Sequence, residues 1–309
     1  MLPLFPYASS LAVWALLNAA CAVGAGVLLF RFLRTSVSGS SARGSSLSQA
    51  NVLLALLSFM PFFEGFEAGQ PVGITLLLSS VMALGTISGA PVPAGVAAGL
   101  LIYKPQLVAG MLVVWCAWRS WKSLVVFACV AAAWIGVDVA LHGVAQYEVY
   151  REVSTWLLTM PIQERFPHYL TVTLLGLSQF FVPASLAPSA WVVSPLLMTA
   201  LGVCVAWAAV QHRADAQQSR GCVVSLALLY PLIASPHALM HDLVVVAPAL
   251  VVASRFVSAG ELLSASLAVY WGALALLMVG CVCHVPLLPL IPVAVFAWQL
   301  RHLAGARSR

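Results

Sequence analysis

Charged residues are scarce in this sequence. Lysine and arginine number 14 and aspartate and glutamate 9, which is 7% of 309 residues, against about 25% in an ordinary soluble domain. Hydrophobic residues make up 62% of the chain and the mean hydropathy is +1.01. Long polar blocks are also missing, so no appended soluble domain is expected. This composition predicts an integral membrane protein.

The alternation of polar and apolar residues that is typical of strands is absent as well. Backbone groups inside a bilayer must bond internally, which restricts spanning structures to helices and closed barrels. We therefore predict an all-α fold, a polytopic transmembrane helical bundle with about 10 to 11 spans, several of them short or broken. Residues 1–309 are expected to form a single integral-membrane domain.

Three other classes of site are disfavoured. Basic residues do not form an aromatic-interleaved face, so no nucleic-acid partner is expected and the net charge of +5 is assigned to membrane topology. The seven cysteines lie mostly in apolar runs, where a thiol acts as a small hydrophobe. Cys281, Cys283 and His284 lack a second ligand pair, so no metal is predicted. The apolar N-terminus has no preceding basic residue and is interpreted as a retained helix.

Apolar runs separated by polar turns give the predicted spans. A full crossing needs about 20 residues, and shorter pieces are allowed where helices break. Residues 170–188 are instead expected to form an interfacial helix on the outer surface, because a crossing there would move Arg213 and Arg220 to the outer side. The predicted spans are 8–33, 49–63, 72–87, 92–103, 107–118, 123–141, 191–210, 222–234, 239–256, 261–283 and 286–300.

Lysine and arginine set the expected orientation. With these spans, most of the basic residues fall on one side, which the positive-inside rule makes cytoplasmic. The N-terminus is then outside and the C-terminus inside the cytoplasmic membrane. The outer side collects Glu64, Glu67 and Asp242, together with an outer-face loop and interfacial helix over residues 142–190. We therefore expect any chemistry that depends on carboxylates to take place on the outer side of the membrane.

The stretch GVAAGLLIYKPQLVAG places a cation and an amide within an apolar region. Pro105 disfavours a helical conformation at Lys104 and should end the rising helix, making YKPQ a turn at the outer face. Gly95 and Gly99 form a small-xxx-small pair that permits close helix contact. Lys104 has two interpretations: a topology anchor that reaches lipid headgroups, or a cation directed at a lipid-linked phosphate.

A second polar cluster, FFEGFEAGQP, lies in a glycine-rich break on the same side. Glu64, Glu67 and Gln70 belong to it. A carboxylate here could serve as a general base or accept a hydrogen bond from a sugar hydroxyl. The alternative is that both glutamates are solvated loop charges.

A third cluster, SPHALMHDLVV, stands at the outer start of a predicted helix. His237 and His241 are four residues apart and would share a helical face, with Asp242 beside them. Asp242 has an alternative interpretation, since a carboxylate at a helix start favours the helix dipole. No H-E-x-x-H pattern is present, so zinc is not predicted.

These segments occur in an order that resembles glycosyltransferase family 87. The resemblance rests on GFEAGQ, PAGVAAGLLIYKPQL, the basic turn WRSWK, and SPHALMHDLVVVAPAL. It implies a GT-C type enzyme similar to polyprenyl-phosphate-mannose-dependent mannosyltransferases. Such an enzyme would move a hexose, with inversion, from a polyprenyl-phosphate donor to a glycan or glycolipid acceptor at the outer face of the membrane, without a metal or other cofactor.

The resemblance also implies roles for individual residues. A carboxylate removes the acceptor proton and a cation stabilises the departing phosphate. Glu67 is the catalytic candidate in this chain. The substrate-binding candidates are Gln70 and Gln106 for sugar or phosphate, Lys104 for phosphate, and His237, His241 and Asp242 for the rim of the cavity.

The chain departs from the family pattern in two ways. The usual catalytic aspartate of the first outer loop has no counterpart, since no aspartate precedes Asp138. Ala68 and Pro71 stand where the family often has histidine and asparagine. We expect first that an N-terminal part is missing, second that Glu67 replaces the aspartate, and third that the protein is an inactive homologue.

Two other functions remain open. Intramembrane breaks with lysine and glutamine could line the pathway of a transporter or flippase for a lipid-linked sugar, although such a pathway needs polar residues through its full depth. A non-catalytic subunit that binds an enzyme through small-residue helix faces is the other alternative.

Overall fold

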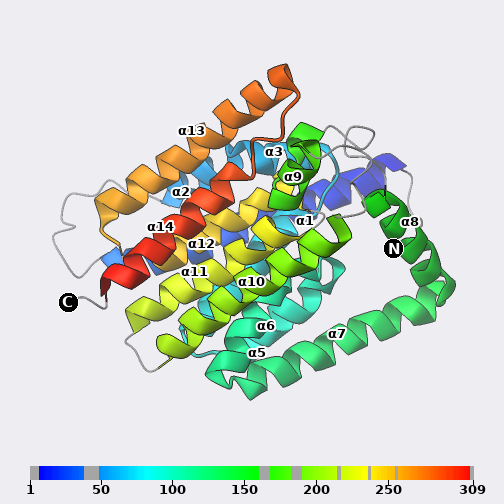
Figure 1. The fold of residues 1–309 in the computed structure, drawn as a ribbon. Helices are drawn as coiled ribbons and strands as arrows, with labels where there is room; N and C mark the ends of the chain where they lie inside the picture. Colours follow the sequence, from blue (N-terminus) through cyan, green and yellow to red (C-terminus); the bar gives the residue numbers. More distant parts are fainter. Residues whose placement is uncertain are drawn as a thin grey trace.

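The fold is a bundle of helices packed at varied angles (Figure 1). A computed structural model describes residues 7–37, 49–159, 168–181, 190–213, 217–235, 238–254 and 257–306. Across these ranges the only strand-like pairing is an isolated antiparallel bridge between Thr171 and Leu239. The prediction of an all-α fold is confirmed.

The described elements are helices from one end of the chain to the other. Within the described ranges, the α-helices and the short 3₁₀ helices (η) are α1 Tyr7–Val37, α2 Gln49–Leu57, α3 Met60–Glu67, α4 Val72–Ile87, α5 Pro91–Leu100, η2 Leu101–Tyr103, α6 Gln106–Trp118, α7 Trp121–His142, α8 Ala145–Thr159, η4 His168–Leu170, α9 Leu174–Phe181, α10 Ala190–Gln211, α11 Gln217–Ala234, η6 Met240–Val245, α12 Val246–Ala253, α13 Ala259–Cys283 and α14 Leu290–Ala306.

Among the residues that the structure describes, three helical segments are long and apolar enough to cross a bilayer: Tyr7–Thr35, Trp121–His142 and Gly260–Cys283. Shorter apolar helices make up much of the remainder, including α4, α6 and the segment Pro91–Tyr103. A bundle with several short or broken spans was expected from the sequence, and the structure has this character.

Helix α11 forms the centre of the bundle. It contacts α6, α10, α12 and α14, and every residue from Gly221 to Ala234 is buried. An apolar helix that is buried on all sides must be enclosed by other helices. The core is therefore organised around one element from the C-terminal half of the chain.

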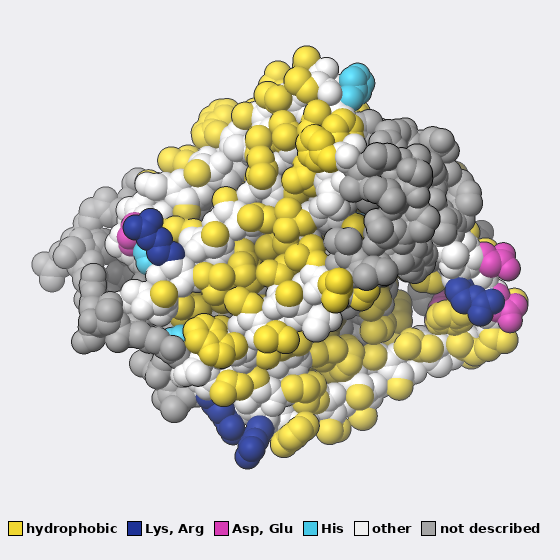
Figure 2. Space-filling view, in the orientation of Figure 1, with side chains coloured by type: hydrophobic (Ala, Val, Ile, Leu, Met, Phe, Trp, Pro, Cys, Tyr) yellow, Lys and Arg dark blue, Asp and Glu magenta, His cyan; other side chains and the backbone are white. Residues whose placement is uncertain are grey.

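The surface of the bundle is largely apolar. Figure 2 shows hydrophobic side chains over most of the visible face, with the charged side chains at its margins. On α7 the exposed large hydrophobic residues include Trp134, Ile135, Val137 and Leu141. An apolar surface of this extent is typical of a protein that faces lipid, in agreement with the predicted membrane protein.

The predicted glycine pair lies at a close helix contact. A Cβ atom added to Gly95 would lie 2.7 Å from the Ser123 carbonyl oxygen, and one added to Gly99 would lie 2.6 Å from Val130 Cβ. Both positions face α7, which packs along α5. The small-xxx-small spacing therefore does permit close approach of two helices.

Prolines change the boundaries of two predicted spans in the structure. The predicted span 49–63 is divided into α2 and α3, because the helix breaks at Phe59, which has an extended backbone, and Pro61 then starts the next helix. The predicted span 286–300 begins only at Leu290, after two prolines in the sequence VPLLPLIP. In both cases proline sets the helix start, while hydrophobicity alone does not.

The predicted loop after α7 contains a further helix, α8. Asp138 on α7 accepts hydrogen bonds from Tyr147 Oη at 2.9 Å and Gln146 Nε2 at 2.6 Å, and it lies 2.9 Å from His142 Nδ1. These contacts join the end of α7 to the start of α8. Within the predicted interfacial segment 170–188, the described helix is α9, and its interfacial location stays a prediction.

Replacing Gly99 with leucine should destabilise the bundle. The new side chain would meet α7 at Val130 and at the Phe127 carbonyl oxygen, 3.1 Å from the added Cβ, and overpacking of this kind costs about 1–3 kcal/mol. We expect a lower thermal unfolding midpoint in detergent. Gly136→Leu is the matched control, because open space surrounds that glycine. An equal loss in both variants would contradict the close contact of α5 and α7.

Candidate functional site

The turn between α3 and α4 is held in place by α1. Trp14 Nε1 donates a hydrogen bond to the Gly69 carbonyl at 3.0 Å, and Gly73 N donates to Asn18 Oδ1 at 3.1 Å. Asn18 is buried. Gly69 has φ +69°, a conformation that glycine adopts without strain. Two side chains of α1 thus fix the GQP turn that the sequence singled out.

The YKPQ segment is a turn between two helices, as predicted. The 3₁₀ helix η2 ends at Tyr103, and α6 begins at Gln106, directly after Pro105. Tyr103 Oη lies 2.8 Å from Thr75 Oγ1, which brings the turn against the first turns of α4. Lys104 therefore sits at the tip of a hairpin and beside the α3–α4 region.

The third predicted cluster is a short 3₁₀ helix, η6, that leads into α12. His241 and Asp242 are both buried there. Asp242 Oδ2 accepts a hydrogen bond from the Leu239 backbone N–H at 3.1 Å, so its carboxylate caps the start of η6. Ala238, just ahead of it, accepts a hydrogen bond from Val172 N at 3.2 Å, which ties this end to the segment before α9.

An ion pair connects two of the three clusters. Lys104 Nζ donates to Asp242 Oδ1 at 2.5 Å, and the side chains are 13% and 2% exposed. The pair therefore lies mostly out of water. Removing one member of a buried pair leaves an uncompensated charge, which is strongly unfavourable. Asp242 thus has two partners: the backbone of its own turn, and a lysine 138 residues away in the sequence.

His241 connects the ion pair to the second cluster, which contains Glu64. Its Nε2 is 3.9 Å from Asp242 Oδ1, and its Nδ1 is 3.6 Å from Glu64 Oε2. The Glu64 oxygen is buried and has no hydrogen-bond partner among the described residues. Glu64, His241, Asp242 and Lys104 thus form a polar row across α3, η6 and the hairpin tip, hereafter the polar row.

Backbone contact between α3 and η6 sets the width of this row. A Cβ atom added to Gly65 would lie 2.5 Å from His241 Cβ and 2.2 Å from Val72 Cγ1. Only glycine allows the α3 backbone to come so close to the histidine. Glu64, the residue just before this glycine, is thereby held beside the imidazole.

The structure brings together Lys104, His241 and Asp242 among the predicted substrate-binding residues. Gln70 and Gln106 are half-buried at the two adjoining turns, and neither side-chain amide has a hydrogen bond within the described ranges. The predicted catalytic residue Glu67 is exposed at the end of α3. His237 lies outside the described residues.

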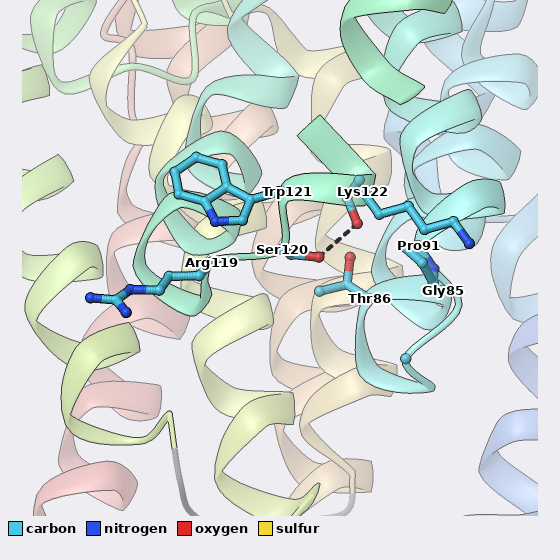
Figure 3. Close-up of a pocket in the computed structure, with 9 residues that line it drawn as sticks. Gly85, Thr86, Pro91, Arg119, Ser120, Trp121 and Lys122 are labelled. Carbon is cyan, nitrogen blue, oxygen red and sulfur yellow. Dashed lines mark hydrogen bonds between the residues drawn. The ribbon is translucent and has the colours of Figure 1, made fainter. Parts of the chain in front are cut away.

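A small cavity lies at the other end of the α5–α6 hairpin. Its volume is about 290 Å³, and its lining includes Thr86, Arg119, Ser120 and Lys122. The side chains of Arg119 and Lys122 extend in different directions, on either side of the hydrogen bond made by Ser120 (Figure 3). Two cations that diverge do not form a single anion site. The candidate functional site is therefore the polar row.

Sequence patterns missed the residues that hold the site together. Tyr103 and Thr75 join the hairpin to α4, and Asn18 anchors the α3–α4 turn. An asparagine in a 31-residue apolar helix is the one signal that was available for the anchor, because a polar group in lipid must find a protein partner. No group of three or more histidine, cysteine or acidic residues suited to a metal ion occurs in the ranges that the structure describes.

Comparison with known proteins gives one match. The family model described as Glycosyltransferase family 87 matches residues 1–236. No curated protein and no solved structure matches the chain. The matched region includes Glu64 on α3 and Lys104 at the hairpin tip, whereas η6 follows it.

Replacing one member of the ion pair should destabilise the protein more than replacing both members together. We expect Lys104→Met and Asp242→Asn to destabilise the protein by about 3–5 kcal/mol each, because each leaves one buried partner alone. The double variant should be less destabilised than the sum of the two. Unfolding in mixed detergent micelles measures the three variants as a double-mutant cycle.

Lys122→Met is the control for loss of a lysine, since Lys122 is exposed and surface charges contribute little to stability. Strict additivity of the two single variants would contradict an energetic coupling between Lys104 and Asp242.

Proposed function

Because the chain belongs to glycosyltransferase family 87, we propose that it transfers a hexose, in particular mannose, from a polyprenyl-phosphate donor to a glycan or glycolipid acceptor. The family makes the chain a membrane glycosyltransferase. The lipid-linked donor, the sugar and the inverting, metal-independent chemistry are our proposal. The single observation that carries it is the buried Lys104–Asp242 pair next to His241 and Glu64.

Lys104 is suited to the phosphate of such a donor. An ammonium has three N–H donors, and the Asp242 carboxylate takes one of them, so two remain for an incoming phosphate. Asp242 holds the ammonium in place before the donor binds. A cation positioned in advance, in a site largely removed from water, stabilises the negative charge that develops on the leaving phosphate.

The residues at the neighbouring turns fit the sugar. Gln70 and Gln106 each present an amide with both donor and acceptor groups, and in the described part of the chain these amides are not engaged with protein. His237 and His241 are proposed at the rim of the same site. A carboxylate of α3, with Glu67 as the candidate from the sequence pattern, removes the proton of the attacking hydroxyl.

The transfer is proposed for the outer face of the cytoplasmic membrane, with the N-terminus outside and the C-terminus inside. The basic residues Arg119 and Lys122 lie at the end of the α5–α6 hairpin opposite to Lys104. Basic residues mark the cytoplasmic side, which supports an outer position for the polar row. A transporter of the same lipid is the alternative function, because a polar row inside a membrane protein can also line a pathway.

Lys104→Ala should abolish the transfer. We expect kcat to fall by at least about 100-fold, because the leaving phosphate loses its cation. The assay uses purified protein in liposomes, with radiolabelled polyprenyl-phosphate-mannose as the donor and octyl mannoside as the acceptor. It measures labelled disaccharide and released polyprenyl phosphate.

Lys122→Ala serves as the matched control, since it removes a lysine at the opposite end of the same hairpin. Unchanged transfer by Lys104→Ala would leave Lys104 as a structural residue only. Movement of the intact donor across the bilayer by the wild-type protein, without sugar transfer, would replace the enzyme proposal with the transporter.

A further inference from the structure

We infer that Glu64, positioned by His241, is the carboxylate that accepts the proton of the attacking hydroxyl. This inference rests on the proposed function and identifies the base of that same site. It differs from the assignment that the sequence pattern favours, which is Glu67.

The first argument is the state of the Glu64 carboxylate. Its Oε2 atom is buried and accepts no hydrogen bond from any described residue, while its side chain as a whole keeps 23% exposure. A buried carboxylate oxygen without a donor is costly in a protein. Glu64 therefore has an acceptor site that is unfilled from within the protein and a side chain that still reaches the surface, which suits a group that receives a hydroxyl proton.

The second argument is charge compensation within the polar row. Two carboxylates, Glu64 and Asp242, share this row with one ammonium, that of Lys104. Asp242 holds the ammonium at 2.5 Å, and the one ion-pair partner of Glu64 among the described residues is the imidazole of His241, with 3.6 Å between Nδ1 and Oε2. That distance is too long for a hydrogen bond. Among the described residues, Glu64 is therefore the carboxylate of the polar row that has no ammonium beside it.

The third argument is the difference between the two glutamates of α3. Glu67 is exposed, with no described hydrogen bond or ion pair, so water solvates it and nothing fixes its position. Glu64 is held by the close contact of Gly65 with His241. A general base must be within hydrogen-bond reach of its proton and fixed in orientation. Glu64 lies in a partly buried place beside the imidazole of His241, whereas Glu67 is exposed at the surface.

The step balances as follows. The acceptor hydroxyl transfers its proton to a Glu64 carboxylate oxygen while its own oxygen bonds to the anomeric carbon. The bond between that carbon and the phosphate oxygen breaks, and its electron pair leaves with polyprenyl phosphate, beside Lys104. Glu64 then releases the proton to water. His241 is a positioning residue: its imidazole lies 3.6 Å from the Glu64 carboxylate, and it packs against α3 at Gly65.

The test compares Glu64→Gln with Glu67→Gln in the liposome assay described above. We expect Glu64→Gln to lower kcat by at least about 100-fold, within the usual contribution of a general base, with the donor KM changed by less than about threefold. The kcat loss in Glu67→Gln should be at least tenfold smaller. Glu148→Gln on the exposed helix α8 controls for the loss of any one carboxylate.

Size-exclusion chromatography and the thermal midpoint report whether each variant is folded. If Glu64→Gln does not fold, Glu64→Asp takes its place: a carboxylate one methylene shorter should retain the fold and lower kcat by about 10- to 100-fold. His241→Phe should lower kcat with the donor KM nearly unchanged, as expected for positioning.

Transfer at the wild-type rate by the folded Glu64 variant would overturn the inference, as would a greater loss in Glu67→Gln. Both results would leave the proposed function intact, because the wild-type protein would still transfer sugar. Absence of transfer by the wild-type protein would instead count against the proposed function itself.

Discussion

The buried pair of Lys104 and Asp242 is the interaction on which the arrangement of the site depends. It joins the tip of the α5–α6 hairpin to η6, two segments separated by 138 residues. Neither group could be left alone in a membrane protein interior, because an unpaired charge there is far more costly than a pair. Asp242 is further held by the Leu239 backbone. The charge on the hairpin therefore has one well-defined position.

Close backbone contacts make this position possible. Helices in lipid associate through packing of small residues, since apolar side chains gain little by leaving the hydrocarbon. Gly65 lies against His241, Gly73 against Asn18, and Gly110 against Ala227. Each contact brings a polar or central element close to a neighbouring helix. The glycines at these positions thus allow these elements to pack closely.

Much of the fold could be predicted from the sequence, because helices, turns and close helix contacts depend on residues that are near one another in the chain. The lengths of the apolar runs predicted the helices, and Pro105 predicted the hairpin turn. The spacing of Gly95 and Gly99 predicted a close contact between helices. The break between α2 and α3 depends on Phe59 and Pro61. Because both residues are apolar, a hydrophobicity pattern does not predict this break.

The candidate site was predictable only in part. Its residue types stood out because charge is rare in this chain, but the pairing of Lys104 with Asp242 and of His241 with Glu64 depends on how distant segments pack. No local pattern carries that information. Glu67 and Glu64 are equivalent in sequence terms, and only burial separates them.

The short hairpin has a consequence for the surrounding bilayer. Helix α6 has 13 residues, so it is about 20 Å long, whereas the hydrocarbon core of a bilayer is about 30 Å thick. Such a mismatch is met by thinning of the adjacent lipid or by neighbouring protein that shields the helix end. Asp242 supplies that shielding for Lys104. The ammonium of a short hairpin therefore has a partner inside the protein and does not depend on the headgroups for one.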